Sequence, residues 1–176
     1  MDSIRWAAFQ ARGRFAAEVE SDRLHLEKTM EWLELAAQNG NGGVASHYDP
    51  VRGRWLSPFP ETTGYVIPTL FDYARFSGQP RFAALAIQLT DWLARVQLPD
   101  GGCMRGVYDE ARAFSEPIVF NTGQNLLGFI RTYDETGDQK YLKYARKAGD
   151  FLVASTDDGG VWDKNLLRGL QHTINA

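Results

Sequence analysis

The sequence contains little cysteine and little histidine. Cys103 is its single cysteine, and it has three histidines among 176 residues. One cysteine cannot form an internal disulfide, nor can it supply the ligands of a cysteine-rich zinc module. The fold therefore needs no oxidising compartment, and a cytoplasmic location is expected.

Long apolar runs and clusters of basic residues are absent as well. Nowhere do 18 apolar residues follow one another, and the first residues lack the apolar core of a signal peptide. The 19 basic and 22 acidic residues give a net charge of −3. This balance argues against a nucleic-acid partner and against an anionic membrane surface. We expect a soluble protein without membrane insertion.

Helical periodicity is the main pattern that the sequence does contain. Apolar residues recur every three to four positions, and the alternation typical of strands is missing. Pro68 is expected to kink the helix that contains it. The sequence predicts an all-α fold with helices over 3–20, 22–37, 63–76, 80–97, 122–136 and 139–154, and with long loops over 39–62 and 98–122.

An internal repeat organises these helices. Thr63-Gly64 corresponds to Thr122-Gly123, and Gly78 corresponds to Gly137, each 59 residues further on. Such a period is typical of stacked supersecondary units. Helices joined by a tight turn form antiparallel hairpins. The sequence therefore predicts one domain over residues 1–176, built from hairpins with a period of about 59 residues.

One repeat position carries an aromatic residue in three copies, namely Trp32, Trp92 and Phe151. We expect these rings in the core and not around a cofactor. The Gly-Gly pairs beginning at 42, 101 and 159 are expected to form turns. A phosphate loop is disfavoured because none of them is followed by Lys and Ser or Thr.

Three segments around these positions resemble the QW motif of α/α-toroid proteins. They span 32–43, 92–102 and 147–162, and the second has Met104 in place of the expected tryptophan. Proteins of this superfamily include squalene-hopene-type cyclases, protein prenyltransferase β subunits and several six-hairpin carbohydrate enzymes. The resemblance implies helix hairpins forming part of an α/α toroid, with the long loops bordering a central cavity.

Residues 60–70, 119–124 and 169–175 are more narrowly similar to bacterial polysaccharide biosynthesis proteins of the VpsJ type. This resemblance covers residues 28–176 and implies a role in cell-surface polysaccharide synthesis. Because such proteins are longer, the chain looks like the N-terminal half of a toroid. An open arc would expose apolar faces at its edges, so either a homo-oligomer or a missing C-terminal half is expected.

The two long loops carry side chains that suit a carbohydrate, because aromatic rings stack on sugars while carboxylates and amides bind hydroxyl groups. Glu61 is the expected catalytic base, held ionised near the N-terminus of a helix. Asp109 is the expected second carboxylate. The expected substrate-binding residues are His47, Tyr48, Asp49, Trp55, Tyr65, Tyr108, Asn121, Gln124 and His172.

Other interpretations stay open. The polar loops could be ordinary surface, with Glu61 a first-turn helix acid, and the protein could be a non-catalytic module that binds glycan or a partner protein. A terpenoid or prenyl enzyme is less favoured, because the acidic motif of the hopene cyclases is absent. A zinc site of Asp100 and Cys103 with His47 or His172 is disfavoured for lack of a histidine pair. No metal and no cofactor are expected, and hydrolase, lyase and epimerase chemistry are not distinguished.

Overall fold

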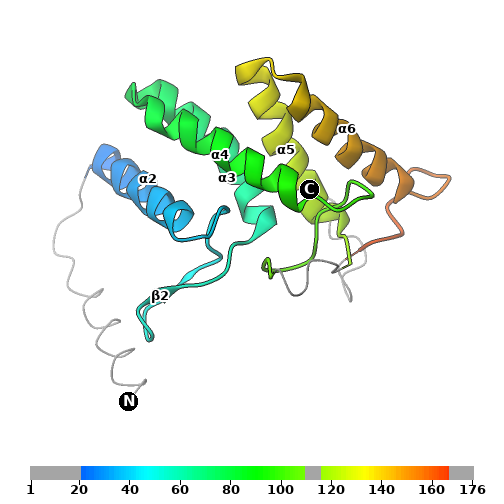
Figure 1. Cartoon of the computed structure of the whole chain (residues 1–176), viewed down its shortest axis with the longest axis horizontal. Coiled ribbons are helices and arrows are strands. Elements are labelled where there is room, and N and C mark those ends of the chain that lie inside the picture. The colour runs from blue at the N-terminus through cyan, green and yellow to red at the C-terminus, as the bar shows by residue number, and fades with distance from the viewer. Residues whose placement is uncertain (1–20, 110–115, 167–176) are drawn as a thin grey trace.

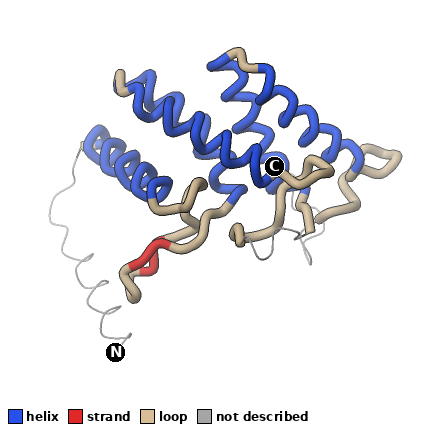
Figure 2. Tube along the Cα trace, in the orientation of Figure 1, coloured by secondary structure: helices blue, strands red, loops and turns tan. Residues whose placement is uncertain are grey.

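The computed structural model describes residues 21–109 and 116–166, which fold mainly into helices (Figures 1 and 2). The all-α prediction is confirmed for these residues. The helix predicted over 3–20 and the candidate His172 lie outside them. The elements are α2 (Asp22–Gln38), β1 (Tyr48–Asp49), β2 (Arg54–Trp55), α3 (Pro60–Ser77), α4 (Pro80–Val96), α5 (Val119–Thr136) and α6 (Gln139–Ala154).

Two helix hairpins form the centre of the molecule. Gly78 ends α3 and Gly137 ends α5, both in the left-handed conformation that glycine adopts without strain, at φ of 68° and 69°. Helix α3 packs against α4 and α5, and α5 packs against α6. Figure 1 shows the short turns at one end of the helices and the long loops at the other. The loops and the N-terminal ends of α3 and α5 therefore lie on the same side.

Equivalent hydrogen bonds tie each long loop to the helix that follows it. The hydroxyl of Thr63 accepts a bond from the Val44 N–H at 2.9 Å and donates to the Phe59 carbonyl at 2.8 Å. The Thr122 hydroxyl accepts from the Cys103 N–H at 2.8 Å and donates to the Ile118 carbonyl at 2.7 Å. Each atom of the second set lies 59 residues after its counterpart in the first. The two loops are thus anchored in the same way.

Substitution of Thr63 by valine tests this anchor. The change keeps the shape of the side chain but leaves the buried Val44 N–H without its partner. We expect a loss of about 1–3 kcal/mol in the free energy of unfolding, measured by urea denaturation. Thr69→Val, at an exposed position of the same helix, is the control and should change stability by less than about 0.5 kcal/mol. Equal midpoints for the two variants would contradict the anchoring role.

Helices α3 and α5 begin three residues earlier than the sequence predicts. The N-cap of α3 is Phe59, which makes no side-chain bond, and Pro60 occupies the first turn. Proline suits this position because its fixed φ is helical and its missing N–H would be unpaired there anyway. The Thr63 hydroxyl lies inside the first turn of α3, where it donates to the Phe59 carbonyl and accepts from the Val44 N–H. It therefore holds the preceding loop and does not cap the helix.

Pro68 lies inside a continuous α3, where the sequence predicts a kink. A proline at this position has no N–H for the Gly64 carbonyl. That carbonyl oxygen faces α5, since a Cβ placed on Gly128 would lie 2.8 Å from it. The gap in the helical hydrogen bonds therefore lies where α3 and α5 are in close contact.

The core confirms two of the three predicted aromatic positions and corrects the third. Trp92 and Phe151 are buried, whereas Trp32 is 50% exposed. The ring of Trp92 lies against Gly42 and Gly43, the glycines of the preceding loop. No such loop precedes Trp32 among the described residues, so its ring packs beside the β1–β2 hairpin instead. The core elsewhere is formed by Met30, Ile67, Leu70, Phe71, Phe82, Leu89, Leu93 and Phe129.

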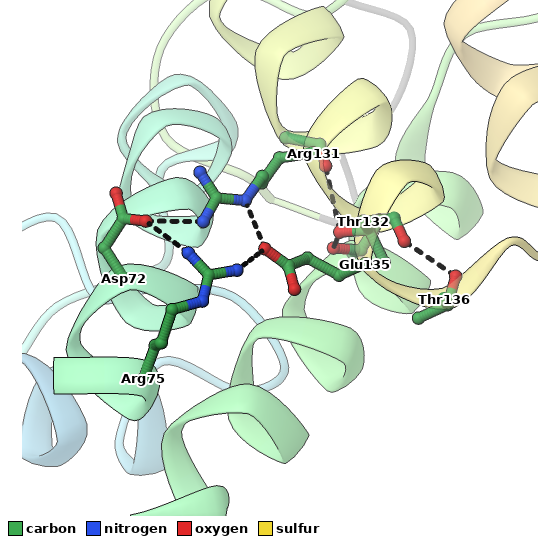
Figure 3. Close-up of polar contacts among 8 residues, drawn as sticks. Asp72, Arg75, Arg131, Thr132, Glu135 and Thr136 are labelled. Atoms are coloured by element: carbon green, nitrogen blue, oxygen red, sulfur yellow. Dashed lines mark hydrogen bonds and ion pairs between the residues drawn. The ribbon is translucent and has the colours of Figure 1, made fainter. Parts of the chain in front are cut away.

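A network of four charged side chains joins α3 and α5 toward their C-terminal ends (Figure 3). Arg131 pairs with Asp72 and with Glu135, and Arg75 reaches the same Glu135 carboxylate at 2.7 Å. The Arg131 guanidinium also lies over the ring of Phe71, 5.9 Å from its centroid. Exposed ion pairs contribute only about 0.2–1 kcal/mol each, so the network adds modestly to the packing of the two helices.

One face of α5 is uncovered among the described residues. Gly123 is the equivalent of Gly64, yet nothing lies within 4 Å of the position its Cβ would take. Leu127 and Ile130, on the same side of the helix, are 51% and 41% exposed. Helix α5 is not an edge helix, because it packs against both α3 and α6, so the exposed apolar faces expected at the edges of an open arc stay a prediction. No helix in the described ranges is long and apolar enough to span a bilayer.

Candidate functional site

A pocket of about 330 Å³ opens where α3 and α5 begin, and we call it the first pocket. The starts of the two helices contribute equivalent positions, because Ile118 and Phe120 follow Phe59 and Glu61 by 59 residues. The loop before α5 closes the remaining side. The lining residues are Phe59, Glu61, Arg105, Gly106, Ile118, Phe120 and Asn121.

Glu61 is the acidic side chain among the residues lining this pocket. It lies in the first turn of α3 and is partly buried. Burial raises the pKa of its carboxyl group above the usual value for glutamate. The sequence argument expects the helix dipole to hold this group ionised, but desolvation has the larger effect. A carboxyl group with a raised pKa is better suited to accept and return a proton.

Arg105 and Asn121 supply the other polar groups of the first pocket. The Asn121 side chain is fixed, because its Nδ2 donates to the Met104 carbonyl at 3.0 Å. Arg105 is on the surface, and its N–H donates to the Glu116 carbonyl at 3.2 Å. Glu61, Arg105 and Asn121 thus line one pocket whose walls are largely apolar.

Cys103 lies close to this pocket but is closed off from it. The thiol is buried, and burial raises its pKa, with the nearby Glu61 charge adding to the effect and the Asn125 side chain opposing it. A thiol with a raised pKa stays protonated and is a poor nucleophile and metal ligand. Among the residues that the structure describes, no three His, Cys, Asp or Glu side chains are grouped to hold a metal ion.

A second pocket, of about 370 Å³, lies beside the β1–β2 hairpin. The loop before α5 reaches it through Tyr108, whose N–H donates to the Pro58 carbonyl at 2.7 Å. The lining residues are Asn39, Gly40, Asn41, Trp55, Leu56, Ser57, Pro58, Tyr108 and Asp109. Trp55 also belongs to a group of three neighbouring rings with Trp32 and Tyr48, which we call the aromatic cluster.

The sequence-predicted residues divide between these places. Glu61 and Asn121 line the first pocket, while Trp55, Tyr108 and Asp109 line the second. The two proposed catalytic carboxylates, Glu61 and Asp109, therefore line different pockets. Tyr48 belongs to the aromatic cluster.

The other predicted residues lie outside both pockets. The Asp49 carboxylate accepts bonds from the Val51 and Arg52 N–H groups and pairs with the Arg52 side chain, which lowers its pKa and fixes the hairpin turn. His47 is exposed beside Ser46, Tyr65 is exposed on α3, and Gln124 is partly buried on α5.

Three apolar walls of the first pocket are not among the predicted residues, namely Phe59, Ile118 and Phe120. The signal for all three was in the repeat, since Phe59 and Ile118 share one position and Phe120 occupies the position of Glu61. The same repeat position holds a carboxylate, Glu61, in one copy and an aromatic ring, Phe120, in the next, so the repeat has diverged at this pocket.

Comparison with known families gives one match. Residues 119–168 match the family model described as D-glucuronyl C5-epimerase C-terminus. The matched segment spans α5 and α6 and includes Phe120 and Asn121 of the first pocket, whereas Glu61 lies outside it. This links the C-terminal part of the chain to a carbohydrate-modifying family and supports a carbohydrate-related function. No curated protein and no solved structure matches the chain.

Proposed function

We propose that the protein binds an oligosaccharide containing uronic acid in the first pocket and transfers a proton at C5 of the uronic acid ring. The observation that carries this proposal is the partly buried Glu61 carboxyl group, with its raised pKa, in one pocket with Arg105 and Asn121. The name of the matched family, which specifies a D-glucuronyl substrate and the C5 position, gives independent support.

The chemistry needs a base and a means of holding negative charge. The hydrogen on C5 of a uronic acid is adjacent to the ring carboxylate. In the proposed step, the Glu61 carboxylate takes this proton, and the electron pair of the broken C–H bond moves into the carboxylate group of the sugar. Arg105 and the Asn121 amide stabilise the added charge as charge-assisted hydrogen-bonding groups. A water molecule on the opposite face gives a proton to C5, which inverts the centre and leaves hydroxide. The proton held by Glu61 then passes to solvent and neutralises this hydroxide, so Glu61 is ionised again and atoms and charge balance without a redox partner.

The setting we propose is the synthesis of a cell-surface polysaccharide, with an oligosaccharide or polysaccharide precursor as partner. The similarity of residues 28–176 to VpsJ-type proteins supports this setting. In an α/α toroid, the first pocket would lie at the mouth of the central cavity, because the loops before α3 and α5 form it. This would give a long glycan access to Glu61 from the loop side.

A titration with a glucuronic-acid tetrasaccharide, followed by amide chemical shifts, tests where the ligand binds. We expect shifts at residues 59–61, 105–106 and 118–121. Arg105→Gln should weaken binding of this ligand about tenfold, corresponding to about 1.4 kcal/mol, because it removes the cation facing the uronate. The same variant should bind the matching glucose tetrasaccharide as the parent does. Shifts confined to the outer faces of α2, α4 and α6 would overturn the proposed site.

A further inference from the structure

The aromatic cluster is an exposed apolar surface at a defined place in the fold. The ring centroids of Trp32 and Trp55 are 4.8 Å apart, and that of Tyr48 lies 5.2 Å from Trp55 and 6.0 Å from Trp32. Trp32 is 50% exposed and Tyr48 is 37% exposed. Large aromatic rings that remain in water while touching one another form a patch that a ligand can cover.

The segment that carries two of these rings is held in place. Tyr48 and Trp55 are paired across the β1–β2 hairpin. Asp49 closes the turn by accepting two backbone N–H bonds, each of 3.0 Å, and Gly53 takes the positive φ of 66° that the turn requires. Fixing the rings before binding lowers the entropy cost of binding.

A polar pocket adjoins the aromatic surface. The second pocket shares Trp55 with the cluster, and its other polar lining comes from Asn39, Asn41, Ser57 and Asp109. Among the residues that the structure describes, no lysine or arginine lines this pocket, in contrast to the first pocket with Arg105. Amides, a hydroxyl and a carboxylate match the hydroxyl groups of a sugar, whereas a uronate would place a second carboxylate beside that of Asp109. Its volume falls in the range of about 300–1,000 Å³ typical of small-molecule sites.

The two pockets are neighbours along two segments of the chain. Pro58 lines the second pocket and Phe59 the first, and on the other side Tyr108 lines the second and Gly106 the first. The bond from the Tyr108 N–H to the Pro58 carbonyl joins these segments. One extended glycan could therefore contact both pockets.

We infer that the aromatic cluster and the second pocket form a subsite for a neutral sugar unit of the glycan whose uronic acid occupies the first pocket. A pyranose ring stacks on Trp55 and Trp32, and its hydroxyl groups bond to the polar lining of the second pocket. The neutral-sugar site stands on its own geometry. Only the statement that both sites hold one glycan rests on the proposed function.

Calorimetric titration with a neutral glucose tetrasaccharide tests the subsite. Trp55→Ala and, separately, Trp32→Ala are expected to weaken binding at least tenfold, while Trp55→Phe retains most of it. Phe76→Ala is the matched control, because this ring is 71% exposed on α3 and belongs to neither pocket; it should leave binding unchanged. Equal melting temperatures of the Trp32→Ala variant and the parent show that the fold is intact.

The same titration on Glu61→Gln and Arg105→Gln separates the two proposals, since both variants should bind the neutral ligand as the parent does. Absence of neutral-sugar binding to the parent at millimolar concentration would overturn the subsite even if the uronic ligand bound in the first pocket. A fall in self-association on Trp32→Ala, with no change in sugar affinity, would also overturn it and assign the cluster to a protein contact.

Discussion

Replacing Gly64 with alanine is expected to lower the free energy of unfolding by about 1–3 kcal/mol. A Cβ at this position would lie 2.6 Å from the Asn125 side-chain oxygen and 2.6 Å from the Gln124 carbonyl oxygen. The carbonyl belongs to the backbone of α5, so α3 and α5 must separate to admit the methyl group. Overpacking of this kind outweighs the roughly 1 kcal/mol that alanine gains over glycine within a helix. Urea denaturation gives the measurement.

Gly123→Ala is the matched control for this prediction. Gly123 occupies the same repeat position on α5, within a helix of similar length, but no atom lies within 4 Å of its added Cβ. Only the gain in helix propensity remains, and stability should rise by up to about 1 kcal/mol. Opposite signs for the two substitutions would establish that the α3–α5 contact depends on Gly64. Equal effects would mean that the two helices are not packed as described.

The comparison of Gly64 with Gly123 also shows what the sequence can and cannot predict. The repeat, the helices and the loop positions follow from periodicity and from the Thr-Gly pairs, because these features act locally. Gly64 and Gly123 look the same in sequence, yet only one is in contact, since contact depends on whether another helix lies alongside. The exposure of Trp32 could not be predicted for the same reason, because its counterpart Trp92 is covered by a loop from the preceding repeat and Trp32 is not.

The candidate site was predictable in part. Glu61 was identified from its place at a helix start and Asn121 as a polar residue at the end of a long loop, and the structure puts them in one pocket. Asp109 could not be assigned to a pocket from sequence, because the path of a loop determines its direction. The direction of the Glu61 pKa shift was also out of reach, since it depends on how far the fold buries this carboxyl group.

Replacing Glu61 with glutamine is expected to reduce proton transfer at C5 at least about 100-fold, because the amide cannot act as a base. The assay is deuterium uptake at C5 of a glucuronic-acid tetrasaccharide in heavy water, followed by mass spectrometry. Binding of the ligand should be retained. Deuterium uptake that is unchanged in Glu61→Gln would remove the catalytic role, and absence of uptake by the parent despite binding would favour a non-catalytic glycan-binding module.

Stability distinguishes a catalytic Glu61 from a structural one. Folding raises the pKa of this carboxyl group, so its ionised form is disfavoured in the folded state. The free energy of unfolding is therefore reduced as pH rises through the folded-state pKa and the group becomes ionised. Glu61→Gln should therefore melt at the same or a higher temperature than the parent at neutral pH. That advantage should vanish below the unfolded-state pKa of about 4.3, where both states are protonated.

The rate of exchange should depend on pH in the corresponding sense. Because the base must be ionised, exchange is lost as pH falls through the folded-state pKa, at a higher pH than an ordinary glutamate would give. If Glu61 instead only stabilises the first turn of α3, Glu61→Gln should melt at a lower temperature than the parent at neutral pH, because a favourable first-turn charge is lost. A lower melting temperature of Glu61→Gln at neutral pH, together with unchanged exchange, would thus identify Glu61 as a helix-stabilising acid.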